Sequence, residues 1–414
     1  MNHPHRVVIT GSGVVTALGS DSDILWQNLV AGRSGVRLIQ SFDTSDQAVK
    51  IAGEVDFDPT GLVDFKVLKR LDRFSQLALV AGIGAVQNSG IDFSRTDNTR
   101  CGVTVGSGIG GLSTIETEHK RLLERGAKRV SPLMIPKLMI NAACGQISIH
   151  FGLLGPNFAT ASACASAAHA IGEAYYAVAR GEADVMLAGG SEAAVTPLAV
   201  AGFAIQKALS TRNDEPEKAS RPFDKNRDGF VLAEGAGILV LEEYEHARKR
   251  GANIMAEFLG FGASADSHNI VAPHPDGTGA VLSMKAALRS AGVNTDQISY
   301  INAHGTGTPL GDETETLAVK TAFGDLANSV PISSTKSMIG HLLGASGAVE
   351  MVATVYSVMN DLVHATINLE TPDPKCDLDY VPNTTREVKV NCALCNSFGF
   401  GGHNATLLIG KLRN

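Results

Sequence analysis

The chain is poor in several features that would assign it to a specialised class of protein. Aromatic residues make up only 5% of its 414 residues, and it has a single tryptophan. No apolar run reaches about 18 residues without interruption, which argues against a membrane-spanning helix. The N-terminal stretch passes directly into a strand pattern, without the charged and apolar regions of a secretory signal. We therefore expect a protein that is not inserted into a membrane.

Cysteine and positive charge are also scarce. Six cysteines are too few to suggest a disulfide framework in a chain of this length, so we expect free thiols and a cytoplasmic location. The formal net charge of −7 argues against nucleic acid as the main partner. Apolar residues make up 44% of the chain and charged residues 19%, so a large core can be buried.

Strand-like and helix-like segments alternate on both sides of Gly251, which predicts two α/β units of similar design, residues 1–251 and 252–414. The segment 101–111, CGVTVGSGIGG, and the segment 298–308, ISYINAHGTGT, both read as a strand that enters a glycine-rich loop. The small-residue helix expected after Cys164 resembles the segment 340–358 in the same way.

Three short motifs suggest a function that their surroundings do not support. Segment 101–111 matches the G-x-G-x-x-G pattern of nucleotide sites, but no acidic strand end follows about twenty residues later. The segment starting at Asp224, DKNRDG, begins like a calcium loop, but Gly235 stands where the essential glutamate should be. Cys392 and Cys395 form C-x-x-C without a second pair, and the alternating pattern around them predicts a strand.

One segment gathers positive charge in this acidic protein. Lys66, Lys69, Arg70 and Arg73 follow the spacing i, i+3, i+4, i+7, which predicts four cations on one face of a single helix. Such a face is either simply solvated or a docking surface for an acidic partner.

Cys164 is the first candidate for chemistry. It stands in SACASA, where a strand pattern passes through a turn into a helix of small, apolar residues that extends to about Ala179. The N-terminus of a helix carries partial positive charge, which favours the reactive thiolate of a cysteine. The alternative is a small buried residue without chemical function.

Two histidines lie in similar surroundings. His304 follows the strand pattern ISYI in a glycine- and threonine-rich loop, and His341 follows Lys336 in SSTKSMIGHLLGA. A cysteine protease would need only one histidine base and an orienting Asn or Asp. Two histidines can instead provide two N–H donors to one developing oxyanion. The enolate formed when a malonyl thioester loses CO2 is such an oxyanion, and its carbanion carbon could attack an acyl group held on Cys164.

The chain resembles the β-ketoacyl-[acyl-carrier-protein] synthases, the condensing enzymes of fatty-acid elongation, over nearly its whole length. The motifs are SACASA, RPFDKNRDGFVLAEGAG, INAHGTGTP, SSTKSMIGHLLGA and CNSFGFGGHN. The resemblance implies a thiolase-like α/β fold of five layers, α-β-α-β-α, with two pseudo-duplicated halves, and a homodimer. It implies acyl carrier protein as the partner and no cofactor of the enzyme's own, since phosphopantetheine arrives on the carrier.

The same resemblance assigns roles to individual residues. It implies that Cys164 carries the acyl group, that His304 and His341 assist decarboxylation, and that Lys336 pairs with Glu315. It also implies a gating role for Phe400, whose N–H would join that of Cys164 in an oxyanion hole. Substrate contacts are implied for Ile109 and Phe203 in the acyl tunnel, for Thr306 and Thr308 on the phosphopantetheine arm, and for Gly399 and Gly401. The carrier-protein surface would consist of Lys66, Lys69, Arg70 and Lys207, and the candidates for a monovalent cation site are Asn302, Glu350 and Asn396.

Related functions fit the residues less well. A thiolase would use a second cysteine beside the last histidine, but His341 lies in MIGHLLG. A non-catalytic partner subunit of a polyketide synthase would lack the nucleophile. An acyl-transfer enzyme or hydrolase that used Cys164 alone would leave Lys336 and His341 without a role. Val271 departs from the threonine that is common in the pantetheine loop of the family.

Overall fold

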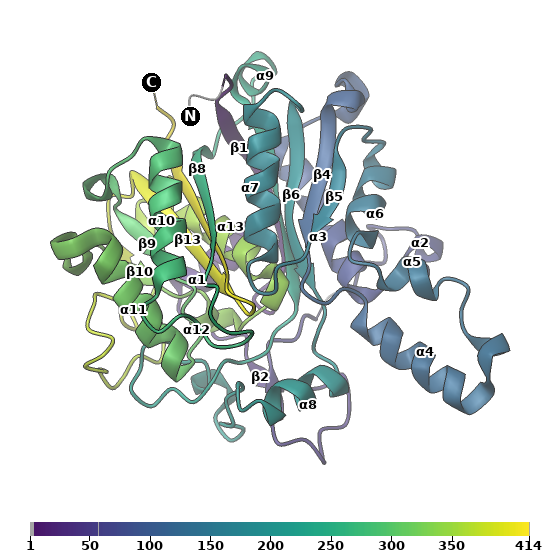
Figure 1. Cartoon of the computed structure of the whole chain (residues 1–414). Coiled ribbons are helices and arrows are strands. Elements are labelled where there is room, and N and C mark those ends of the chain that lie inside the picture. The colour runs from purple at the N-terminus through teal and green to yellow at the C-terminus, as the bar shows by residue number, and fades with distance from the viewer. Residues whose placement is uncertain (1–3, 57, 414) are drawn as a thin grey trace.

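The computed structural model describes residues 4–56 and 58–413, and these residues form a ten-stranded mixed sheet in the order β10-β9-β13-β14-β8-β1-β7-β6-β4-β5 (Figure 1). Its strands are β1 (Val7–Val15), β4 (Cys101–Gly106), β5 (Asn157–Thr160), β6 (Val185–Glu192), β7 (Gly235–Glu243), β8 (Ala256–Ala265), β9 (Tyr300–Asn302), β10 (Ile332–Ser333), β13 (Cys392–Gly399) and β14 (His403–Gly410). Two small sheets pair β2 (Arg37–Leu38) with β3 (Ile51–Ala52) and β11 (Leu362–Val363) with β12 (Arg386–Glu387).

The large sheet repeats one topology twice. In each half, the strands follow the order third, second, fourth, fifth, first, and the parallel and antiparallel pairings are the same in both halves. The first strand of one half, β1, pairs with the first strand of the other, β8, and joins the two. The prediction of two pseudo-duplicated α/β halves is therefore confirmed. We propose that they divide at Gly251, which lies in an exposed turn with a φ of 72°.

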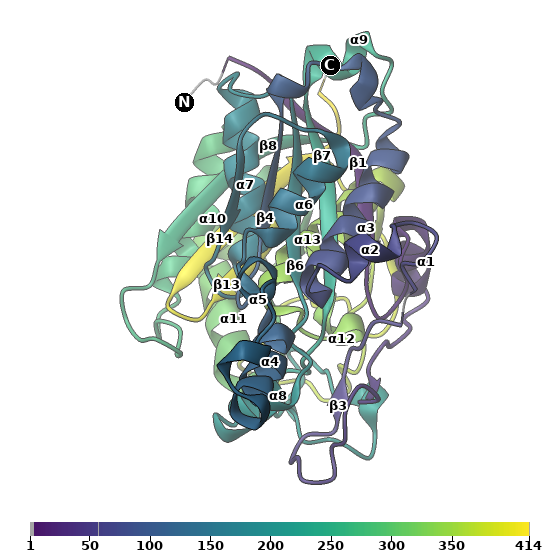
Figure 2. The ribbon, with the colours of Figure 1, turned by 90° about the vertical axis from the view of Figure 1, so that its right-hand side faces the viewer.

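Helices lie on the two outer sides of the sheet and also between its two halves (Figures 1 and 2). On one outer side, α3 (Arg73–Ser89) and α6 (Ala142–Phe151) pack on strands of the first half, and on the other α10 (Thr278–Ala291) packs on β8 and β14. Between them, α7 (Ser166–Ala179) and α13 (Ser346–Asn360) each contact strands of both halves. These are the five layers that were expected.

The central helices are built from residues that suit burial on every side. Residues 346–358 of α13 are all buried, and most of α7 is alanine or another small residue. A Cβ atom on Gly172 of α7 would lie 2.5 Å from the ring of Phe261 in β8, so the close approach of helix and strand requires glycine there. Burial of each large apolar side chain in this layer stabilises the fold by about 1.5–3 kcal/mol.

The remaining helices lie around the edges of this core. They are α1 (Ser22–Val30), α2 (Phe65–Leu68), α4 (Leu112–Arg125), α5 (Met134–Leu138), α8 (Pro197–Ile205), α9 (Tyr244–Lys249), α11 (Pro309–Phe323) and α12 (Lys336–Ile339). Among the described residues, no helix is both long enough and apolar enough to cross a bilayer.

The predicted single helix with four cations on one face is wrong. The helix α2 ends at Leu68, and a new helix, α3, begins at Arg73, because the side chain of Asp72 accepts a hydrogen bond from the N–H of Phe74 and caps it. Arg73 forms an ion pair with Glu234, with 2.6 Å between Nη2 and Oε1. The charge of Arg73 is therefore neutralised by Glu234 of the same chain, so Arg73 does not belong to a surface that would bind an acidic partner.

Candidate active site

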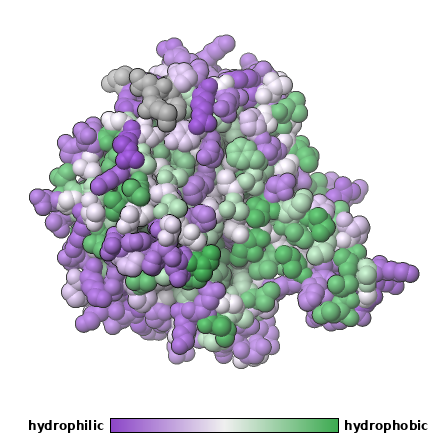
Figure 3. Space-filling model, in the orientation of Figure 1, coloured by the Kyte–Doolittle hydropathy of each residue, from purple (hydrophilic) through white to green (hydrophobic). Residues whose placement is uncertain are grey.

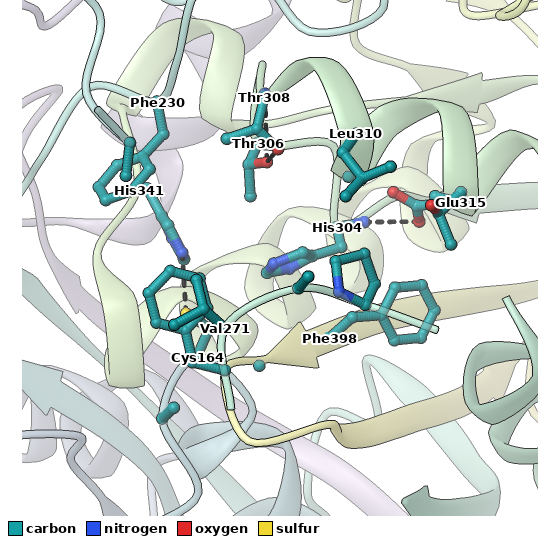
Figure 4. A pocket seen from close by; sticks show the side chains of 18 of the residues that line it. Cys164, Phe230, Val271, His304, Thr306, Thr308, Leu310, Glu315, His341 and Phe398 are labelled. Carbon is teal, nitrogen blue, oxygen red and sulfur yellow. Dashed lines mark hydrogen bonds between the residues drawn. The ribbon is translucent and has the colours of Figure 1, made fainter. Parts of the chain in front are cut away.

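A cavity of about 440 Å³ lies where loops of the two halves meet, and it contains the three candidate residues for chemistry (Figure 4). Cys164 comes from the first half, and His304 and His341 come from the second. The Sγ atom and a ring nitrogen of each histidine lie within 4.8 Å of one another. The structure thus brings together three residues that the sequence had indicated separately.

Cys164 lies in the turn between β5 and α7. The turn is tight, since Ala163 has a φ of 50°, and α7 begins at Ser166 rather than at the cysteine. Burial raises the pKa of the Cys164 thiol to about 11, although the charge of Lys336 and a hydrogen bond from the backbone N–H of Phe400 both lower it. The expected bias toward thiolate is therefore wrong for the resting site, because desolvation outweighs the favourable charges.

His341 lies directly beside the nucleophile. Its Nε2 is 3.1 Å from Sγ of Cys164 (Figure 4). Its Nδ1 is 2.8 Å from Oγ of Ser346. The rings of His341 and His304 pack edge to face, 5.4 Å apart. Burial, reinforced by the positive charge of Lys336, lowers the pKa of both histidines well below the ordinary value, so both imidazoles are neutral at physiological pH.

Lys336 determines which nitrogen of His304 carries the proton. Its ammonium donates to the carbonyl oxygen of His304 at 2.6 Å and lies 3.3 Å from Nδ1 of the same residue. An ammonium group can only donate, so Nδ1 must accept with its lone pair. The proton of neutral His304 therefore lies on Nε2, where it can be donated to a bound oxyanion.

The expected pairing of Lys336 with Glu315 is wrong. The fully buried ammonium of Lys336 forms its ion pair with Glu350, on α13. The carboxylate of Glu315, on α11, instead accepts hydrogen bonds from the backbone N–H groups of His304, at 2.9 Å, and Gly305, at 2.7 Å. Glu315 thus holds the backbone of the loop that carries His304, and burial raises its pKa to about 7.

Most of the other expected substrate positions line this cavity. They are Ile109, Phe203, Thr306, Thr308, Gly399 and Phe400, and Lys207 lines it as well. Gly401 is outside the lining, and its N–H donates to the carbonyl oxygen of Ile270. Lys66, Lys69 and Arg70 are exposed in and just after α2, apart from the cavity.

At two possible metal sites, the hydrogen bonds and ion pairs of the structure already occupy candidate ligands. The spacing of Cys164, His304 and His341 would suit a soft cation, but the Nε2 of His304 carries a proton and has no free lone pair. Among the cation candidates, Asn302 donates to the carbonyl oxygen of Glu350 at 3.1 Å, whereas the amide of Asn396 bonds to Thr406 and Met284. The carboxylate of Glu350 neutralises Lys336.

Sequence reasoning missed one buried group beside the cavity, Glu192. It ends β6 and is completely shielded from solvent, and its carboxylate accepts hydrogen bonds from two loops that contribute to the cavity lining. The only signal in the sequence is an acidic residue at the end of an otherwise apolar strand, VMLAGGSE.

Comparisons with known proteins agree with this geometry. A family model of the β-ketoacyl synthase N-terminal domain matches residues 5–247, and one of the C-terminal domain matches residues 255–370. The relative from Coxiella burnetii named 3-oxoacyl-[acyl-carrier-protein] synthase 2 is 50% identical over 408 residues, which cover 98% of this chain and 99% of the relative. The protein of that name from Synechocystis is 50% identical over 407 residues, 98% of each chain.

Solved structures extend the likeness to the whole fold. A β-ketoacyl synthase from Burkholderia phymatum superposes with a TM-score of 0.92 at 38% identity, covering 99% of this chain and 100% of that one. A type II polyketide synthase ketosynthase, solved in complex with its acyl-carrier protein, gives a TM-score of 0.93 at 33% identity, with the same coverage. The predicted thiolase-like fold is thus confirmed, and the chain belongs to the β-ketoacyl synthase family.

Proposed function

We propose that this protein is an acyltransferase, a 3-oxoacyl-[acyl-carrier-protein] synthase of fatty-acid biosynthesis that lengthens an acyl chain by one two-carbon unit. The observation that carries the proposal is the placement of Cys164 within 4.8 Å of two neutral histidines. A nucleophile and two N–H donors in one buried cavity are what a decarboxylative Claisen condensation requires.

The reaction divides into a transfer and a condensation. The acyl group first moves from the carrier's phosphopantetheine sulfur to Sγ of Cys164, and the proton of the thiol passes to the departing carrier thiolate. Malonyl carrier protein then binds and loses CO2, and the electron pair of the broken bond forms an enolate. Its carbon attacks the thioester carbonyl of the acylated cysteine, and Cys164 leaves as the thiolate.

Each polar group near the sulfur has a defined role in these steps. The Nε2–H of His304 and the ring of His341 stabilise the enolate oxygen during decarboxylation, and each such donor contributes about 10²–10³-fold to a rate. We assign the backbone N–H groups of Phe400 and Cys164 to the thioester oxygen of the acylated cysteine; the N–H of Phe400 already bonds to the thiol of Cys164. Both histidines stay neutral because they are buried, so neither ring becomes protonated at physiological pH.

The proposed partner is an acidic acyl carrier protein, and the enzyme has no cofactor of its own. The exposed Lys66, Lys69 and Arg70, with Lys207 at the cavity, offer positive charge in a protein whose net charge is −7. Thr306 and Thr308 line the cavity with their hydroxyl groups 3.0 Å apart, where a phosphopantetheine arm would pass. The free thiols of all six cysteines fit the reducing cytoplasm.

We also propose that the protein is a homodimer. The strand β5 ends the large sheet with one free edge, and Phe158 on it is 40% exposed. Around it, Leu123 in α4, Ile135 in α5 and Ile149 in α6 are 59–75% exposed, and Figure 3 shows hydrophobic side chains gathered on this side of the molecule. A second copy would cover this apolar face, and sedimentation should give twice the chain mass.

The substitution Cys164→Ala tests the proposed reaction. We expect this variant to form no acyl-enzyme and no condensation product, because no other side chain in the cavity can hold the acyl group as a thioester. Incubation with acyl carrier protein and malonyl carrier protein, together and separately, followed by intact-mass measurement, provides the assay. Acylation of the variant, or hydrolysis without condensation by the native protein, would contradict the proposal.

A further inference from the structure

Glu192 accepts four hydrogen bonds from two loops beside the nucleophile, and it makes no contact with a cation among the described residues. One oxygen, Oε1, accepts from Oγ of Ser107 at 2.8 Å and from the N–H of Ile109 at 3.2 Å. The other, Oε2, accepts from the N–H of Gly108 at 2.8 Å and from that of Gly344 at 3.0 Å. Three of the four partners are backbone N–H groups, which can only donate. Burial raises the pKa of Glu192, and these hydrogen bonds lower it.

These bonds connect two segments that come from different halves of the protein. Gly108 and Ile109 follow β4, and Gly344 lies three residues after His341 and next to Leu343, which has a φ of 46°. Gly108, Ile109, His341 and Leu343 all line the cavity. A Cβ atom on Gly344 would lie 2.2 Å from the backbone nitrogen of Gly108 and 2.7 Å from Oε2 of Glu192, so the two loops already touch around the carboxylate.

We infer that Glu192 is a positioning residue that fixes the shape of the apolar end of the cavity, and thereby the acyl chains that Cys164 can accept. The inference rests on the proposed function. Glu192 itself does not line the cavity, so it acts through Ile109 and Leu343, whose side chains do. Ile109 and Leu343 pack in the apolar cluster that contains Cys164, so the tail of an acyl group held on Cys164 would lie against them. The effect of Glu192 should therefore grow with chain length.

The substitution Glu192→Gln should weaken the hold on one of these two loops and leave the other in place. Whichever oxygen position the amide NH2 takes, it faces two donors. At the Oε2 position both are backbone N–H groups, which cannot reverse. At the Oε1 position one is the hydroxyl of Ser107, which can rotate and accept. The amide nitrogen should therefore occupy the Oε1 position, and the N–H of Ile109 should lose its acceptor.

The experiment measures single-turnover acylation of Cys164 by butyryl- and tetradecanoyl-carrier protein, by intact mass. We expect Glu192→Gln to keep transfer of the butyryl group near the native rate and to slow transfer of the tetradecanoyl group about tenfold, as for loss of one buried hydrogen bond at a tunnel residue. Ser107→Ala removes only one of the four donors and should change the same ratio in the same direction, by less.

A matched control is Glu242→Gln, at the opposite end of the same strand pair, where Glu242 faces Val185 of β6. Glu242 is also fully buried and holds Thr10, His246 and Arg250. This variant should lose stability but keep the native ratio of the two acylation rates. An unchanged ratio in a folded Glu192→Gln or Ser107→Ala variant would overturn the inference. Failure of the native protein to acylate Cys164 would instead overturn the proposed function.

Discussion

The buried pair of Lys336 and Glu350 supports a prediction that separates stability from catalysis. Replacing Lys336 with methionine removes a fully buried ammonium and leaves the carboxylate of Glu350 without a counter-charge. Breaking a buried pair by removing one partner destabilises a protein by about 3–5 kcal/mol. The second substitution, Glu350→Gln, removes the remaining charge, so the double variant should regain most of this loss.

Catalysis should not recover with stability. In both variants Nδ1 of His304 loses the ammonium that keeps it unprotonated, and the proton can then move from Nε2 to Nδ1. Hydrogen bonds to charged groups contribute about 1.5–3 kcal/mol, so decarboxylation should slow by about 10–100-fold. The assay is CO2 release from malonyl carrier protein, measured beside the free energy of unfolding in urea.

Two outcomes would refute this reasoning. Native decarboxylation by a folded Lys336→Met/Glu350→Gln variant would show that Lys336 does not set the proton position of His304. Glu315 provides the control for the pairing, because it bonds to backbone N–H groups rather than to Lys336. If Lys336→Met were rescued by Glu315→Gln and not by Glu350→Gln, the ion pair described here would be the wrong one.

Three further predictions follow from the site and its surroundings. His304→Ala and His341→Ala should each raise the decarboxylation barrier by about 2–4 kcal/mol, as for loss of an oxyanion donor, and unchanged CO2 release would contradict this. Charge reversal at Lys66 and Lys69 should weaken carrier-protein binding and flatten its dependence on salt, whereas equal affinity would mean that the face is only solvated. Burial lowers the pKa of His364 from 6.5 to about 4, so the unfolded chain binds this proton first and stability falls as pH drops through that range. Between these pH values the native protein should lose about 3 kcal/mol more unfolding free energy than the His364→Gln variant. If the unfolding free energies of the two proteins fell in parallel with pH, the lowered pKa of His364 would be excluded.

The sequence predicted the reacting groups better than it predicted the residues that hold them in place. Cys164 stands where a strand pattern turns into a helix of small residues, and His304 and His341 each stand in a glycine-rich turn. These signals are local in the sequence, so they could be recognised without knowing the fold. The partner of Lys336 depends on which helix packs behind it, and Glu350 on α13 was no more evident than Glu315 on α11. The break between α2 and α3 did have a local signal, since Asp72 is a typical N-cap residue.

Glu192 shows why such residues escape sequence reasoning. Its donors lie 84 residues earlier, at Gly108, and 152 residues later, at Gly344. Nothing near VMLAGGSE reveals that two distant backbone segments converge on this carboxylate. The same holds for the pKa of Cys164. The helix that follows the cysteine predicts activation, whereas the burial that opposes it comes from residues far from it in the chain, from Val36 to Leu343, that cluster around the side chain.

The central layer also determines when during folding this site can exist. The helices α7 and α13 contact strands of both halves, and β1 pairs with β7 and β8, which lie more than half the chain away. Neither half can bury its own central helix alone, so the two should fold as one cooperative unit, and such long-range pairing makes folding slow. The thiol and the imidazoles meet only when the halves dock, so a partly folded chain carries no reactive cavity.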